Sequence, residues 1–200
     1  MKTEAQAEDA LNCVIVVSGL PRSGTSMIMK MLEKGGVEPI TDQVRQADED
    51  NPLGYYEVER MKRLPRQEDR SWISQARGKA LKAISHLLKS VPSSLDYQVI
   101  FMNRHLDEVL ASQNKMLARN GSSTDPSQDE KMRFRYQKHL GEIKTWLSEQ
   151  PNFRVLYLEY SDVVANPLDQ ARRISDFLGQ TLDTAAMASA VEERLYRNRK

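Results

Sequence analysis

The chain has 200 residues, of which 40% are hydrophobic and 28% charged, a composition that fits one folded domain with a buried core. Its 29 basic and 28 acidic side chains leave a formal net charge of +1. This balance excludes the strong overall field that steers a protein onto nucleic acid or an anionic membrane, so an anionic ligand must be held by a local site.

The cysteine and histidine content argues against a disulfide framework and against a zinc site. Cys13 is the only cysteine, and the three histidines lack the spacing of metal ligands. The first ten residues are polar, and the longest unbroken apolar run, 13–17, is too short to span a bilayer. We therefore expect a cytoplasmic protein without a metal ion, a nucleic-acid partner or a transmembrane segment.

The first unit is a strand, a glycine-containing loop and a helix. Residues 13–17 (CVIVV) form a short β-branched run that is typical of a strand buried on both faces. A turn with two glycines and a proline follows over 18–24, and apolar residues then recur at helical spacing until Gly35 and Gly36.

The middle of the chain has weaker signals. Residues 41–77 are polar and irregular, and the alternating charges over 59–70 are typical of a solvated helix face. Residues 99–102 predict a second buried strand, and 106–117 predict the helix that leaves it. Before them, four apolar residues at helical spacing predict a helix ended by Pro92, although the same stretch overlaps a possible strand: Leu81, Ile84, Leu88 and Val91.

The last third of the chain has clearer boundaries. Residues 120–129, rich in glycine, serine and aspartate, predict a mobile loop, and 136–147 predict a long helix. Residues 153–160 predict a third strand, and a final helix begins near Thr184. The helix between them has a cap residue, a proline in its first turn and a glycine beyond its end: Asn166, Pro167 and Gly179.

Strands that alternate with helices predict parallel pairing through right-handed crossovers. We expect an α/β fold of the P-loop nucleotide-binding type, a three-layer sandwich with a parallel sheet, as a single domain over 1–200. Ligands of such sheets bind beyond the carboxyl ends of the strands, which here are 18–26 and the residues after Met102.

Residues 19–26 (GLPRSGTS) have the G-x-x-x-x-G-x-S spacing of a phosphate-binding loop. The backbone N–H groups of such a loop, together with the N-terminus of the next helix, can hold a phosphate. Thr25 stands where a nucleotide triphosphatase requires lysine, which disfavours binding of the β- and γ-phosphates of ATP. The cation of this loop is Arg22. A tight turn without a ligand is the alternative interpretation.

A second candidate anion site follows the second strand. Arg104 lies just beyond that strand, and Ser112 lies eight residues later, on the following helix. An arginine can bind a phosphate with two N–H groups, and a serine can donate a further hydrogen bond. Two anion sites on one sheet edge predict a ligand with phosphate-like groups at both ends.

These motifs resemble those of a known family. Residues 21–26 (PRSGTS) resemble the 5′-phosphosulfate loop of the sulfotransferases, and Arg104 with Ser112 resembles their 3′-phosphate motif. Residues 158–179 (from LEYSD to FLG) resemble the family's downstream strand and helix, and 51–57 (NPLGYYE) resembles a segment of bacterial members. The resemblance runs from Val14 to about Gly179 in matching order.

The resemblance implies transfer of a sulfuryl group from 3′-phosphoadenosine 5′-phosphosulfate to a small-molecule, glycan or peptide acceptor, without a metal. It assigns Arg22 to the sulfuryl group and the bridging oxygen, and it assigns Tyr160 to the adenosine. The basic tail has no clean match to the family's C-terminal phosphate clamp. The residues expected at the donor site are Pro21, Arg22, Ser23, Gly24, Thr25, Ser26, Arg104, Ser112, Tyr160 and Arg197.

The catalytic base remains open between two residues. Cytosolic members carry Lys-Thr-His before the second predicted strand, whereas this chain keeps the lysine as Lys82 and has Ile84 in place of the histidine. Glu57, in the expected acceptor segment of about 41–78, is the first candidate, and His86 is the second. Lys82 is expected to assist at the sulfuryl group. A tryptophan that stacks on adenine in the family is Met27 here.

Two other functions fit the same loop. A nucleotide or small-molecule kinase of the P-loop type is the rival enzyme, and the missing loop lysine counts against it. A nucleotide-binding module without catalysis is the rival from another class, and the absent Lys-Thr-His signature favours it.

Overall fold

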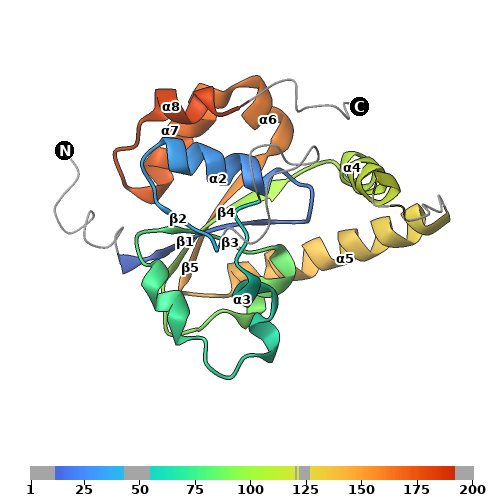
Figure 1. The fold of residues 1–200 in the computed structure, drawn as a ribbon, viewed down its shortest axis with the longest axis horizontal. Coiled ribbons are helices and arrows are strands. Elements are labelled where there is room, and N and C mark those ends of the chain that lie inside the picture. The colour runs from blue at the N-terminus through green and yellow to red at the C-terminus, as the bar shows by residue number, and fades with distance from the viewer. Residues whose placement is uncertain (1–11, 43–54, 120, 122–126, 192–200) are drawn as a thin grey trace.

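The structure is a computed structural model that describes residues 12–42, 55–119, 121 and 127–191. Its centre is a five-stranded parallel sheet with the strand order β2–β3–β1–β4–β5 (Figure 1). No helix within the described ranges is long and apolar enough to cross a membrane. The strands are β1 (Val14–Gly19), β2 (Pro39–Ile40), β3 (Ala80–Lys82), β4 (Tyr97–Asn103) and β5 (Phe153–Glu159).

The register of the sheet brings the carboxyl ends of its strands to one edge. β1 lies in the middle, where Val17 is paired with Lys82 of β3 and Gly19 with Met102 of β4. Met102 is in turn paired with Leu158 of β5. Loops that leave β1, β3, β4 and β5 therefore start side by side, which is where ligands of parallel sheets bind.

Helices cover both faces of the sheet (Figure 1). The α-helices are α2 (Thr25–Lys34), α3 (Glu59–Lys62), α4 (Leu106–Arg119), α5 (Ser127–Ser148), α6 (Tyr160–Ala165), α7 (Pro167–Leu178) and α8 (Thr184–Ser189). Three 3₁₀ helices are η1 (Leu64–Arg66), η2 (Ser71–Ala76) and η3 (Ser85–Ser90).

Two hydrophobic cores make the three layers. Alternate residues of β1 point to opposite faces, so Ile15 and Val17 pack against α2, α6, α7 and α8, whereas Val14 and Val16 pack against α3, α5 and the 3₁₀ helices. All four side chains are fully buried. The three-layer α/β sandwich with a parallel sheet is therefore confirmed.

The helix predicted over 81–91 is wrong for its first part, where the possible strand that overlaps it is confirmed. Residues 80–82 form β3, which pairs with β1, and η3 follows after a break at Ile84. Leu81 is fully buried against the sheet core, and the N–H of Ala83 donates to the carbonyl of Val17, so pairing with β1 overrides the helical spacing. β2 was also missed, because two residues are too short to make a period-two pattern.

Other boundaries differ more locally. Tyr160, expected in the third strand, begins α6, and the region 41–77 contains α3, η1 and η2. α5 starts at Ser127, so the predicted loop over 120–129 is wrong for its last three residues, while 120 and 122–126 lie outside the described residues. The ends of α7 are confirmed, with Pro167 in its first turn and Gly179 left-handed at φ 69°, and Asn166 is at the N-cap although its side chain makes no cap hydrogen bond.

Candidate active site

The loop between β1 and α2 has an unusual backbone. Gly19, Arg22 and Gly24 have φ values of 145°, 69° and 100°. Arg22 is one of two non-glycine residues with positive φ in the described part of the chain, and such a conformation is typical of functional loops. A Cβ atom on Gly24 would lie 2.6 Å from a ring carbon of Tyr160, so the loop needs glycine where it meets α6.

Ser23 is the most buried polar residue of the loop itself, with 1% of its surface exposed. Its Oγ has no hydrogen-bond partner among the described residues, although its backbone N–H donates to the carbonyl of Leu20. The next helix, α2, has Gly24 as its N-cap and therefore no side-chain cap. A buried hydroxyl without a partner beside an uncapped helix N-terminus is suited to an anionic ligand.

A cavity of about 230 Å³ opens beside Ser23 at the carboxyl ends of β4 and β5. Polar side chains line much of it, among them Lys144 of α5. Its lining residues are Leu20, Ser23, Met102, Asn103, Arg104, Val109, Leu140, Lys144 and Glu159.

The two anion sites expected from the sequence are joined by direct hydrogen bonds. Arg22 Nε donates to Ser112 Oγ of α4 at 3.0 Å. Arg104, which follows β4, donates from Nη1 to the backbone carbonyl of Arg22 at 3.0 Å. The structure thus brings together the loop cation and both residues of the second site.

Arg104 is held by three contacts. Besides its bond to the loop, its Nε donates to Glu108 Oε2 at 2.9 Å, and the guanidinium lies 4.1 Å from the ring centroid of Tyr160. The side chains of Arg104 and Glu108 are only 7% and 6% exposed. Burial raises the pKa of Tyr160, so its hydroxyl stays protonated at neutral pH. The two bonds use two of the five N–H donors of Arg104.

Glu108 was missed by the sequence analysis. The only signal for it is the i, i+4 spacing from Arg104, which is common on helices. The carboxylate partly offsets the charge of Arg104, so this site is less cationic than the sequence suggests.

A second group of contacts connects the loop with the segment that starts at Tyr55. Lys82, at the end of β3, donates from Nζ to Ser26 Oγ at 2.9 Å and to the carbonyl of Tyr55 at 2.8 Å. Lys82 lies beside β1 in the sheet, opposite Val17. One ammonium group therefore ties the start of α2 to the expected acceptor segment.

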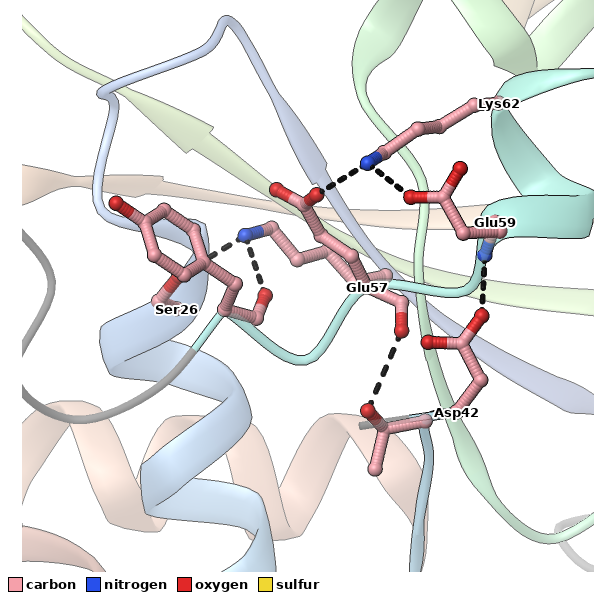
Figure 2. Close-up of polar contacts among 8 residues, drawn as sticks. Ser26, Asp42, Glu57, Glu59 and Lys62 are labelled. Carbon is pink, nitrogen blue, oxygen red and sulfur yellow. Dashed lines mark hydrogen bonds and ion pairs between the residues drawn. The ribbon is translucent and has the colours of Figure 1, made fainter. Parts of the chain in front are cut away.

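Glu57 lies two residues beyond this contact (Figure 2). Its Oε2 atom is 2.9 Å from Nζ of Lys62, and its side chain is 21% exposed. Its backbone carbonyl accepts a hydrogen bond from the Thr41 hydroxyl at 3.2 Å and from the N–H of Asp42 at 3.4 Å. Asp42 also accepts from the N–H of Glu59 at 2.6 Å.

His86 has different neighbours. Its ring stacks on that of His139 of α5, with centroids 3.7 Å apart and planes at 4°. A hydrogen bond of 2.8 Å joins Ser85 Oγ and His139 Nε2. Burial lowers the pKa of both histidines, that of His139 to about 4, so both are neutral at pH 7. His86 is thus part of a contact between η3 and α5, and not of the contacts that Lys82 makes with Ser26 and Tyr55.

The remaining expected site residues lie outside the described residues: Arg197 and, in the acceptor segment, 43–54. In the described ranges, no three histidine, cysteine or acidic side chains come together as metal ligands would. A parallel sheet with the order 2–3–1–4–5 and a glycine-containing loop between its central strand and the first helix defines an α/β protein of the P-loop type.

The comparisons with known proteins identify the family. The family model for the sulfotransferase domain matches residues 14–200, and the chain therefore belongs to the sulfotransferase family. No curated protein matches the chain significantly.

Solved structures of sulfotransferases have the same fold. STF1 from Mycobacterium tuberculosis shares 19% identity over 92% of this chain and 73% of its own, with a TM-score of 0.56. STF9 from Mycobacterium avium shares 16% over 98% and 71%, with a TM-score of 0.57. Mouse SULT7A1, solved as a complex with PAP, shares 15% over 100% and 74%, with a TM-score of 0.50.

Proposed function

We propose that the protein transfers a sulfuryl group from 3′-phosphoadenosine 5′-phosphosulfate to a hydroxyl or amine of a small-molecule, glycan or peptide acceptor. The observation that carries this proposal is the hydrogen-bonded connection of Arg22, Ser112 and Arg104, which puts two candidate anion sites beside one loop. Membership of the sulfotransferase family supports the reaction type.

The residues present fit this donor. Ser23, with its unpartnered buried hydroxyl, Gly24 and the N-terminus of α2 would hold the 5′-phosphate. Arg104 and Ser112 would hold the 3′-phosphate, because Arg104 has N–H donors beyond the two it uses on Glu108 and the loop. Tyr160, in contact with both Arg104 and the loop, would border the adenosine.

Three side chains of the protein would each have a separate role in the transfer step. When bound, the donor supplies the sulfuryl group: the S–O bond to its 5′-phosphate breaks as the bond from the acceptor oxygen or nitrogen to sulfur forms. Arg22 would stabilise the negative charge that grows on the departing phosphate oxygen. Glu57 would take the proton that the acceptor loses, and Lys82 would hold the Tyr55–Glu57 segment against the loop through Ser26 and Tyr55.

Glu57 is favoured over His86 by its surroundings. Lys82 joins Ser26 at the start of α2 to Tyr55, two residues before Glu57, whereas the His86 ring stacks on His139 of α5. A kinase is disfavoured by Thr25 in the place of the loop lysine. A binding module without catalysis is separated from the enzyme by the assay below.

The test is sulfuryl transfer from the labelled donor to a broad panel of acceptors, measured for the wild type, Glu57→Gln and His86→Asn. We expect Glu57→Gln to lose turnover by ~10²–10⁴-fold and His86→Asn to lose much less. Calorimetry of adenosine 3′,5′-bisphosphate with each variant shows whether the donor site is intact. The reverse ranking would make His86 the base, and tight nucleotide binding without transfer to any acceptor would favour the binding module.

A further inference from the structure

Lys62 lies between two carboxylates, one of which belongs to the proposed base, Glu57 (Figure 2). Its Nζ is 2.9 Å from Oε2 of Glu57 and 2.6 Å from Oε1 of Glu59. Glu59 and Lys62 are the first and last residues of α3, three positions apart, so Glu59 holds the ammonium group from within the same helical turn. The lysine can therefore stay in place whether or not Glu57 carries its charge.

The backbone around Glu57 is held by the two residues that follow β2. Thr41 and Asp42, beyond β2, donate to the carbonyl of Glu57, and Asp42 accepts from the N–H of Glu59. With the main chain held by these bonds, the direction of the Glu57 carboxylate depends on what its side chain contacts. The contact made by Lys62 is at Oε2, an atom shielded from solvent, although the Lys62 side chain is 46% exposed.

We infer that Lys62 is a positioning residue for Glu57: it orients the carboxylate that would accept the acceptor's proton. The inference rests on the proposed function, in which Glu57 is the base. The carboxylates of Glu59 and Glu57 raise the pKa of Lys62, so the lysine stays charged at neutral pH.

This pair differs from an ordinary surface ion pair. Lys79 and Glu38 are 2.7 Å apart at the amino end of β3, but the Glu38 side chain is 66% exposed, and such pairs contribute little. The Glu57 carboxylate is much less exposed and is close in sequence to Tyr55, which Lys82 ties to the loop. Among the described residues, the charged side chains whose contacts reach the 55–59 segment include Lys62 and Glu59 of α3, Asp42 beyond β2 and Lys82 of β3.

The test compares kcat and KM separately for the wild type, Lys62→Met, Lys62→Arg and the matched control Lys79→Met. Without its ion pair, the Glu57 carboxylate is no longer held in one direction, so we expect Lys62→Met to lower kcat by roughly tenfold while KM changes little. Lys62→Arg keeps a cation beside the carboxylate and should restore most of kcat, and Lys79→Met should leave both constants unchanged.

The outcomes separate the inference from the proposed function. If Glu57→Gln is inactive but kcat of Lys62→Met equals that of the wild type, the inference is wrong and the proposed function stands. If Glu57→Gln keeps wild-type turnover, Glu57 is not the base and Lys62 has no positioning role in the reaction. The proposed sulfuryl transfer would still stand, with another residue as the base. An equal loss of kcat in Lys79→Met would assign the effect to overall charge and would also overturn the inference.

Discussion

Replacing Gly24 with alanine probes the closest approach in the site, between the loop and α6. Gly24 has a φ of 100°, and an added Cβ would lie 2.6 Å from Cδ2 and 2.9 Å from Cε2 of Tyr160. Ordinary contacts begin near 3.4 Å, so the methyl group overlaps the ring. Tyr160 is buried and has the guanidinium of Arg104 4.1 Å from its ring centroid, which leaves the ring little room to move.

Two energetic costs, one from the backbone conformation and one from the steric overlap, lower the stability of Gly24→Ala. A left-handed backbone costs an L-residue roughly 1–2 kcal/mol. Forcing a methyl group into a packed contact costs a further ~1–3 kcal/mol. The free energy of unfolding should therefore fall by about 2–5 kcal/mol, a large part of the stability of an ordinary domain.

Gly36→Ala is the matched control, because Gly36 also has a φ of 100° but its added Cβ would meet nothing within 4 Å. This variant should lose only the backbone term of about 1–2 kcal/mol. Urea unfolding followed by tryptophan fluorescence measures both. Equal losses in the two variants would refute the argument that the loop is packed against Tyr160.

Three further predictions concern the arginines and the histidine pair. Arg104→Ala should weaken binding of adenosine 3′,5′-bisphosphate by about 1.5–3 kcal/mol in calorimetry, and unchanged affinity would remove Arg104 from the proposed phosphate site. Arg22→Ala should lower turnover by roughly a hundredfold while product affinity falls less; unchanged turnover would exclude its role in the transition state. The pKa of His139 is about 4 in the folded protein, against about 6.5 in an unfolded chain, so unfolding takes up a proton between these values. The free energy of unfolding should thus fall as the pH drops from about 6.5 to 4, and His139→Gln should flatten this dependence in urea titrations; identical slopes would argue against it.

The sequence predicted those helices and strands whose hydrophobic pattern or end signals lie within the element itself. β1 and β4 are runs buried on both faces, and α7 has signals at both ends, so their positions follow from neighbouring residues alone. β2 and β3 have two and three residues and exist because β1 and the rest of the sheet pair with them. Such short strands depend on tertiary pairing, which local periodicity does not encode.

The candidate site divides in the same way. The residues of the loop 19–26 are consecutive, and the spacing of its two glycines is typical of a phosphate-binding loop, so the sequence alone located it. The bond between Arg22 and Ser112 joins residues 90 positions apart, and the stack of His86 on His139 joins two distant elements. Lys62 looked like part of a solvated charge run, because only the fold turns its ammonium toward Glu57. The chemical roles of these residues stay predictions.

The measurement that tests the central claim most directly needs no acceptor. Isothermal titration calorimetry of the wild-type protein, with chelator present, compares adenosine 3′,5′-bisphosphate with ADP. Two candidate phosphate sites beside one loop, and threonine in place of the loop lysine, predict that adenosine 3′,5′-bisphosphate binds without magnesium and more tightly than ADP. Tighter binding of ADP, or binding of either nucleotide only when magnesium is added, would contradict the account and point to a kinase.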